Sequence, residues 1–100
     1  MKNGYKIVWS NEARDNLSQI IDYFEEKWTE RELKKFFQRL EKIINLISQN
    51  PRLFMLTKKR KNVRRCVLSK QTSIYYKFDS ERIFIITLFD NRQNPKSLKI

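Results

Sequence analysis

The chain has 100 residues, which is enough for one domain with a single hydrophobic core. It contains no histidine, one cysteine and one glycine, and these counts exclude a Ser-His-Asp triad, a Cys/His zinc site, an internal disulfide and a glycine-rich phosphate loop. The 22 Lys and Arg residues against 11 Asp and Glu residues give a net charge of +11, so we expect an anionic partner, either a nucleic acid or an acidic protein.

The sequence predicts a single domain over residues 1–100 in the cytoplasm. No apolar run approaches the length of a membrane span, and the start of the chain passes directly into a strand pattern, so neither a spanning helix nor a signal peptide is expected. The lone Cys66 fits a reducing compartment. We expect no metal and no cofactor.

The N-terminal part predicts a short strand followed at once by a helix. Tyr5, Ile7 and Trp9 stand at every second position and therefore share one face of a strand. Ser10 is expected to be the N-cap of the helix, because its hydroxyl can accept a hydrogen bond from a free amide of the first turn.

Two amphipathic helices are predicted next. The apolar stripe of the first consists of Ala13, Leu17, Ile20, Ile21, Phe24 and Trp28. Thr29 and Glu32 have the spacing of a capping box that opens the second helix, and Pro51 ends it. Its stripe consists of Leu33, Phe36, Phe37, Leu40, Ile43, Ile44 and Ile47. Because the link between them is short, the two helices are expected to form an antiparallel hairpin that covers a common surface.

The second half of the chain predicts a three-strand antiparallel meander. Residues 63–68 and 73–78 alternate with a period of two, and residues 82–89 form an apolar run that suits a central strand. Residues 51–62 show little periodicity, and no element is predicted there. The fold class is therefore α+β with the order β-α-α-β-β-β, in which the helical hairpin packs on one face of a small, mainly antiparallel sheet.

The excess positive charge lies almost entirely in the second half of the chain. Residues 1–50 hold nine Lys and Arg against eight Asp and Glu, whereas residues 51–100 hold thirteen against three. Seven of these cations, together with Arg92, form the predicted surface for a target or a nucleic acid: Lys58, Lys59, Arg60, Lys61, Arg64, Arg65 and Lys70. The alternation places Arg65 on the same side as Val63 and Val67, so it does not decide which of the two faces meets solvent.

The residues that remain for chemistry are cationic and phenolic. Asp22, Glu25 and Glu26 lie within about a turn of the first helix, and we interpret them as a solvated face rather than as a carboxylate pair. The other candidates are Arg64, Arg65, Lys70, Tyr75, Tyr76, Lys77 and Arg92. Such groups could stabilise a phosphorane and move protons while RNA is cleaved through its 2′-hydroxyl. We favour the alternative that the tyrosines pack in the sheet and the cations bind an anionic partner.

Six segments of the chain follow one another in a recognisable order and spacing: Tyr5-Lys6-Ile7-Val8-Trp9-Ser10 leading into Ala13 and Leu17, Ile43-Ile44, Asn50-Pro51-Arg52, Val63-Arg64-Arg65, Ile74-Tyr75-Tyr76 and Leu88-Phe89-Asp90-Asn91-Arg92-Gln93-Asn94-Pro95. In these segments the chain resembles the RelE/ParE superfamily of toxins from type II toxin–antitoxin systems. The resemblance implies a compact toxin held inactive by an antitoxin that is encoded beside it. The antitoxin is expected to be acidic and to wrap the toxin with its C-terminal region in an oligomeric complex.

The superfamily implies two activities, of which ParE-like gyrase poisoning is favoured. RelE-like members cut mRNA on the ribosome, and in their pattern Arg64 and Arg92 would be the catalytic residues. Cys66 and Ser73, however, stand where that pattern has a lysine and an arginine, and no tyrosine follows Arg92. We therefore expect a growth-inhibiting, non-enzymatic poison of DNA gyrase. The alternatives are a ribosome-dependent mRNA endonuclease and a non-catalytic nucleic-acid-binding module.

Overall fold

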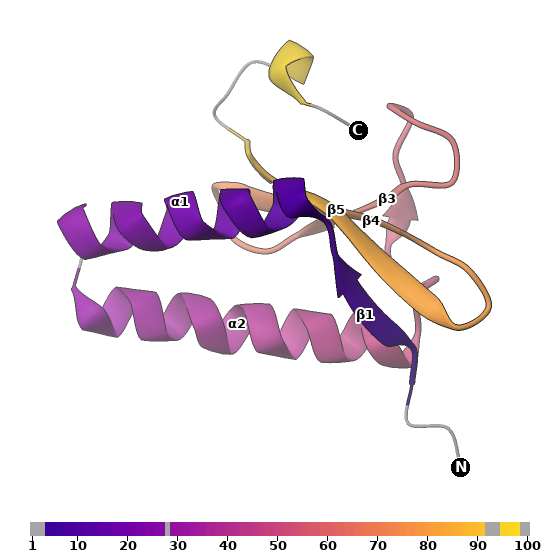
Figure 1. Cartoon of the computed structure of the whole chain (residues 1–100), viewed down its shortest axis with the longest axis horizontal. Helices are drawn as coiled ribbons and strands as arrows, with labels where there is room; N and C mark the ends of the chain where they lie inside the picture. Colours follow the sequence, from indigo (N-terminus) through magenta and orange to yellow (C-terminus); the bar gives the residue numbers. More distant parts are fainter. Residues whose placement is uncertain (1–3, 28, 92–94, 99–100) are drawn as a thin grey trace.

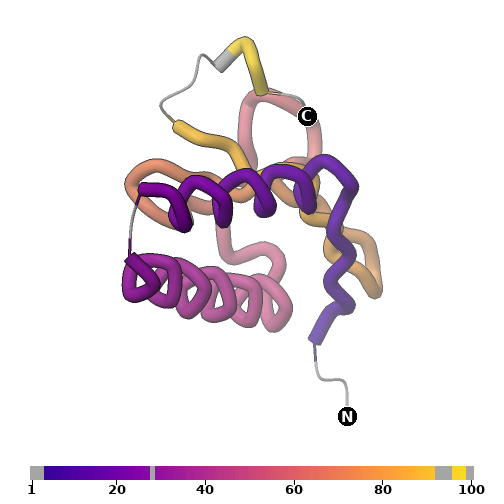
Figure 2. The backbone as a smooth tube through the Cα atoms, turned by 60° about the vertical axis from the view of Figure 1, so that its left-hand side comes forward, coloured from indigo at the N-terminus to yellow at the C-terminus, as the bar shows by residue number. Residues whose placement is uncertain are grey.

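A computed structural model describes residues 4–27, 29–91 and 95–98. The elements are β1 (Lys6–Trp9), α1 (Asn11–Lys27), α2 (Glu30–Gln49), β2 (Met55–Leu56), β3 (Arg64–Val67), β4 (Thr72–Phe78), β5 (Arg82–Asp90) and the short 3₁₀ helix η1 (Pro95–Ser97). The helices α1 and α2 lie side by side and run in opposite directions in both views (Figures 1 and 2). The α+β prediction with a helical hairpin on a small sheet is confirmed.

The five strands form one sheet in the order β1-β5-β4-β3-β2. The strands β3, β4 and β5 make the predicted antiparallel meander, and β1 pairs with β5 in parallel. The strand β5 therefore has a strand on each side, as its apolar sequence predicts. The sequence does not predict β2, because a strand of two residues is too short to show alternation.

The core lies between one face of the sheet and the apolar stripes of the two helices. Phe24 of α1 and Phe36 of α2 meet there with ring centroids 5.3 Å apart, which joins the helices to each other. Tyr5, Ile7 and Trp9 pack against this core together, as their alternation predicts. The buried members of the core are Ala13, Phe24, Phe36, Leu40, Ile47, Cys66, Leu68, Ile74, Tyr76, Ile83, Ile85 and Leu88.

Not every described member of the predicted helical stripes is buried. Phe37 lies at the edge of the α2 stripe and is 38% exposed. Trp28 lies outside the described residues. In the part of the chain that the structure describes, no helix has both the length and the apolar character needed to span a membrane.

A β-bulge in β5 changes which residues of that strand face the core. Tyr75 is opposite Thr87 and Tyr76 is opposite Ile85, so Ile86 is the extra residue. Ile85 faces the core before the bulge, and Leu88, three positions later, faces the core after it. The bulge explains why the apolar run of β5 shows no regular alternation.

Beyond the end of β1, the start of α1 supplies the hydrogen-bond partners along this edge of β5. The amide of Ser10 donates to the carbonyl of Ile85 at 3.0 Å, and the hydroxyl of Ser10 donates to the carbonyl of Ile86 at 2.6 Å. The same hydroxyl accepts from the amide of Ala13 at 2.9 Å, which confirms Ser10 as the N-cap. A backbone group freed by the bulge thus gains its partner from the start of the helix.

Asn16, further along α1, makes additional hydrogen bonds to β5. Its Oδ1 accepts from the Thr87 hydroxyl at 2.7 Å and from the Leu88 amide at 3.1 Å, while its Nδ2 donates to Glu12 Oε2 at 3.0 Å. The carboxamide therefore serves as the hydrogen-bond partner that a neighbouring strand would otherwise supply to Leu88.

Replacing Asn16 by alanine should destabilise the fold. Asn16→Ala leaves the Leu88 amide and the buried Thr87 hydroxyl without their acceptor, so the free energy of unfolding should fall by about 1 to 3 kcal/mol. Urea denaturation measures the change. Asn16→Asp keeps the accepting oxygen and should recover part of the loss, whereas Ser18→Ala on the exposed side of α1 should change stability by less than about 0.5 kcal/mol. Equal stability of Asn16→Ala and Ser18→Ala would contradict this role.

Candidate functional site

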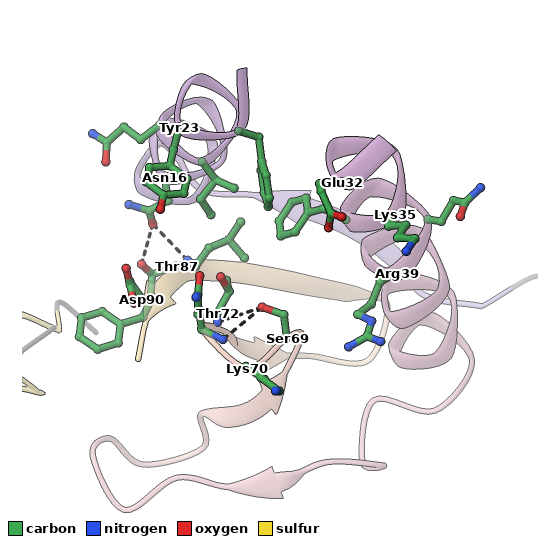
Figure 3. Close-up of a pocket in the computed structure, with 18 of the residues that line it drawn as sticks. Asn16, Tyr23, Glu32, Lys35, Arg39, Ser69, Lys70, Thr72, Thr87 and Asp90 are labelled. Atoms are coloured by element: carbon green, nitrogen blue, oxygen red, sulfur yellow. Dashed lines mark hydrogen bonds between the residues drawn. The ribbon is translucent and has the colours of Figure 1, made fainter. Parts of the chain in front are cut away.

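A groove of about 950 Å³ lies between the two helices and the end of the sheet (Figure 3). We call it the helix–sheet groove. Its lining comes from α1, from α2, from the β3–β4 turn at residues 69–71 with Thr72, from the end of β5, and from Ser97. Its volume lies in the range of ligand-binding clefts, and its open shape also admits a polypeptide segment.

The helical periodicity explains which side chains reach the groove. On α1 the lining residues share one face of the helix, because positions three or four apart lie above one another: Glu12, Asn16, Gln19, Ile20, Tyr23 and Phe24. On α2 they are Phe36 of the apolar stripe and the polar residues beside it: Glu32, Lys35, Gln38, Arg39 and Lys42. Among the lining residues, Phe24, Phe36 and Leu88 are buried and Ile20 is half-buried, so the base of the groove is largely apolar, with the buried Thr72 and Thr87 beside it. The lysine, arginine and glutamate residues of the lining are exposed and form its upper walls.

Positive charge dominates the wall formed by α2 and the β3–β4 turn. Lys35 and Arg39 come from α2, and Lys70 comes from the turn (Figure 3). Lys42 of α2 also lines the groove. Arg39 also donates to the carbonyl of Leu68 at 3.3 Å, which ties α2 to the end of β3. The acidic lining residues are Glu12, Glu32 and Asp90. An apolar base beside a cationic wall suits an amphipathic segment with acidic side chains.

The turn that carries Lys70 is held in a fixed shape. Ser69 Oγ accepts from the amides of Gln71 and Thr72 at 3.3 and 3.2 Å, and the Leu68 amide donates to the Thr72 carbonyl at 2.8 Å. Residues 69–71 thus connect the two strands that the alternating segments of the sequence predict. Lys70 is exposed at the tip of this turn and reaches the groove from the side of the sheet.

Four of the predicted binding residues lie in another place, in the loop between β2 and β3. We call residues 57–62 the β2–β3 loop. Lys58, Lys59, Arg60 and Lys61 are all exposed there, and none of them lines the helix–sheet groove. The structure thus separates the predicted cationic surface into at least two regions, of which Lys70 belongs to the groove and these four residues to the loop.

The side chain of Arg64 stabilises the fold through hydrogen bonds to backbone carbonyls. Its NH1 donates to the carbonyl of Phe54 at 2.7 Å and to the carbonyl of Arg52 at 3.4 Å, and its guanidinium carbon lies 5.7 Å from the ring centroid of Phe78. It pairs across the strands with Tyr76, which is in the core. Arg64 is therefore on the helix-covered face of the sheet, where it holds the segment that follows α2.

Arg65 is on the opposite face. It is exposed, it lies across from Tyr75, and its NH2 donates to Asn91 Oδ1 at 3.4 Å. Lys77, two residues after Tyr75 on β4, shares this face. The cationic and phenolic candidates are thus divided: Arg64 and Tyr76 lie on one face of the sheet, and Arg65, Tyr75 and Lys77 lie on the other.

The buried acid–base groups of the sheet are held in their neutral forms. Tyr76 is fully buried and its hydroxyl donates to the Pro51 carbonyl at 2.8 Å; burial raises its pKa to about 12, although the Arg64 charge acts in the opposite direction. Burial likewise raises the pKa of the Cys66 thiol to about 11. Cys66 and Ser73 are both buried, and Ser73 Oγ donates to Asn91 Oδ1 at 2.8 Å.

Arg92, the remaining predicted site residue, lies outside the described residues. Asn16 and Thr87 are not predicted as site residues from the sequence, although each carries a readable signal. Asn16 is a polar residue between Ala13 and Ile20 on the apolar stripe, and Thr87 is a hydroxyl inside an apolar run. Among the described residues, no three Asp, Glu, Cys or His side chains gather as a metal site.

Comparison with known proteins gives a family and a fold. A family model described as the ParE toxin of the type II toxin–antitoxin system parDE matches residues 7–95. Among solved structures, the chromosomal ParDE system from P. aeruginosa is similar with a TM-score of 0.73 and 15% identity, covering 89% of this chain and 98% of that one. The sequence matches no curated protein.

Two further solved structures share the fold. The E. coli DinJ–YafQ toxin–antitoxin complex gives a TM-score of 0.62 at 11% identity and covers 87% of this chain and 92% of that one. A copper-bound mutant toxin from Helicobacter pylori gives 0.53 at 14% identity, with 87% and 94% covered. At these identities the likeness is one of fold.

The neighbouring arginines Arg64 and Arg65 should differ sharply in their effect on stability. Arg64→Gln removes a charged donor from two carbonyls and should lower the free energy of unfolding by about 1.5 to 3 kcal/mol. Arg65→Gln, on the exposed face, should lower it by less than about 0.5 kcal/mol. Chemical denaturation of the two single variants measures the difference. Equal stability losses would show that Arg64 is not a structural residue.

Proposed function

The chain belongs to the ParE toxin family of type II toxin–antitoxin systems, and we propose that it stops growth by poisoning DNA gyrase in the cytoplasm. In this proposal it acts by binding rather than by cutting nucleic acid. An acidic antitoxin neutralises it in an oligomeric complex.

The observation that carries the proposal is the division of the candidate catalytic groups between the two faces of the sheet. A ribonuclease must bring a charge-stabilising cation and a proton-transfer group to the same phosphate. Arg64 and Tyr76 lie on the face beneath the helices, and their polar atoms already bond to backbone carbonyls. Arg65 and Tyr75 lie on the other face, separated from them by the sheet.

Proton transfer on this sheet is also poorly supported near neutral pH. The chain has no histidine, and burial holds the pKa of Tyr76 near 12 and that of Cys66 near 11. Each missing group that stabilises a transition state lowers a rate by orders of magnitude, since one such donor typically contributes about 3 kcal/mol. A binding surface demands none of these groups, so this arrangement favours a protein-targeting toxin.

A supercoiling assay with purified gyrase tests the proposal. The purified chain should inhibit the supercoiling of relaxed plasmid and should trap linear, cleaved DNA when the reaction is stopped with detergent. Because the chain is strongly cationic, the control is relaxation of the supercoiled form of the same plasmid by a type I topoisomerase, which should proceed normally. Unimpaired gyrase together with mRNA cut on ribosomes would overturn the proposal in favour of the endonuclease.

For the antitoxin, we propose that an acidic amphipathic segment from its C-terminal region occupies the helix–sheet groove. The apolar base accepts an apolar stripe, and burial of such surface contributes about 25 cal/mol per Å². The cations Lys35, Arg39, Lys42 and Lys70 along one wall would orient the acidic face of the segment. Solved relatives described as toxin–antitoxin complexes support an antitoxin as the occupant.

Reversing charge inside the groove should weaken the antitoxin complex. The variant Lys35→Glu with Lys70→Glu places two acids on the cationic wall, and the affinity for the antitoxin encoded beside the toxin should fall by about tenfold or more. Isothermal titration calorimetry measures the affinity. The matched control is Lys27→Glu with Lys34→Glu, which makes the same change of net charge on exposed helix positions outside the groove. An equal loss in both variants would exclude the groove as the binding site.

A further inference from the structure

We propose that the β2–β3 loop is a phosphate-binding element that holds this toxin on double-stranded DNA. Lys58, Lys59, Arg60 and Lys61 follow one another along the loop, and all four side chains are exposed. The loop projects from the sheet at the upper right of Figure 1, on the side of the molecule away from the α1–α2 connection. The inference concerns direct contact with nucleic acid and is independent of the proposed action on gyrase.

The loop presents its cations from a closed hairpin. The strands β2 and β3 pair in the register Met55 with Arg65 and Leu56 with Arg64. The Thr57 amide then donates to the Val63 carbonyl at 2.8 Å, which closes the base of the loop. Thr57 Oγ1 accepts from the Lys59 amide at 3.1 Å, and the next residue after the four cations, Asn62, has a φ of 66°. The buried Val63 fixes the start of β3, so the four cations are held together outside the core.

The part of the sequence that surrounds the loop contains no acidic residue that could offset its positive charge. Between Glu41 and Asp79 the sequence contains no Asp or Glu. The ion pair formed among the described residues by Arg82 and Asp79 belongs to the β4–β5 turn and does not involve the loop. Four adjacent like charges repel one another in solvent, and an anionic partner removes that repulsion.

The composition of the loop favours nucleic acid over an acidic protein. Protein interfaces are centred on apolar, aromatic or arginine residues, and lysine is depleted there. The loop holds three lysines and one arginine between Thr57 and Asn62, with no apolar side chain. Exposed apolar side chains occur next to it on β2, at Met55 and Leu56, but these precede the loop. Phosphate binding requires only the cations.

The compact size of the loop favours a duplex over a single strand. Double-stranded DNA carries one negative charge per about 1.7 Å of its axis, whereas each strand alone carries half that density. A short convex loop with four cations can therefore neutralise more phosphates on a duplex. If each cation neutralises one phosphate, the slope of log affinity against log salt is about −3.6 for a duplex, from four contacts at about −0.9 each.

Fluorescence anisotropy with a short labelled DNA duplex of mixed sequence tests the proposal without gyrase or antitoxin. The wild-type chain should lose at least about 150-fold in affinity between about 50 mM and 200 mM salt, which is the fourfold change in salt raised to the power 3.6. In the variant with Lys58→Gln, Lys59→Gln, Arg60→Gln and Lys61→Gln together, the slope should become shallower by about 3 to 4.

A matched variant separates the loop from the effect of net charge. Arg14→Gln, Lys27→Gln, Arg31→Gln and Lys34→Gln together remove the same four charges from exposed helix positions and should leave the affinity within about threefold of wild type. Equal losses in the two variants, or wild-type binding by the loop variant, would overturn the proposal. Tighter binding to a single-stranded RNA than to the duplex would overturn the assignment to duplex DNA. Circular dichroism melting of each variant confirms that it is folded.

A third variant tests the competing possibility of an acidic protein at the same place. Met55→Ser with Leu56→Ser removes the exposed apolar side chains beside the loop and should leave duplex affinity unchanged within about twofold. If this variant loses duplex binding as strongly as the loop variant does, binding does not rest on phosphate contacts and the proposal fails.

Discussion

The arrangement of this molecule depends on how the second half of β5 obtains hydrogen-bond partners. The strand β1 ends at Trp9, and a bulge at Ile86 interrupts the pairing with β4. Ser10 and Asn16 fill these gaps, since they bond to the Ile86 carbonyl and to the Leu88 amide from the first turns of α1. A buried backbone group without a partner destabilises a fold by about 1 to 3 kcal/mol, so these contacts fix where α1 lies.

The position of α1 determines the helix–sheet groove. Because α1 is tied along the edge of β5 and α2 packs beneath it through Phe36 and Leu40, the polar sides of the two helices leave an open space near the end of the sheet. The β3–β4 turn brings Lys70 to this space from a distant part of the sequence. The cations of the second half of the chain thereby reach different environments: Arg64 stabilises the fold, Lys70 lines the groove, and residues 58–61 project into solvent.

Much of the fold could be predicted from the sequence because it rests on periodicity. The stripes of α1 and α2, the N-cap at Ser10 and the meander of β3, β4 and β5 are each set by local patterns. The faces of Arg64 and Arg65 could not be predicted, because β3 has only four residues and each face carries both apolar and charged side chains. The groove could not be predicted either, since it depends on a bulge and on the contact between Asn16 and Thr87, residues 71 positions apart.

The two cationic surfaces differ in a way that affects how a partner can act on each. The groove combines charge with an apolar base, so a segment bound there would be held by burial, which salt does not screen. The loop offers charge alone, and attraction between exposed charges is largely screened beyond about 8 Å at physiological salt. None of the four loop cations lines the groove, and an anion that binds the loop finds no apolar base to occupy. The two surfaces can therefore be occupied independently, and a toxin whose groove is covered still carries the charge of its loop.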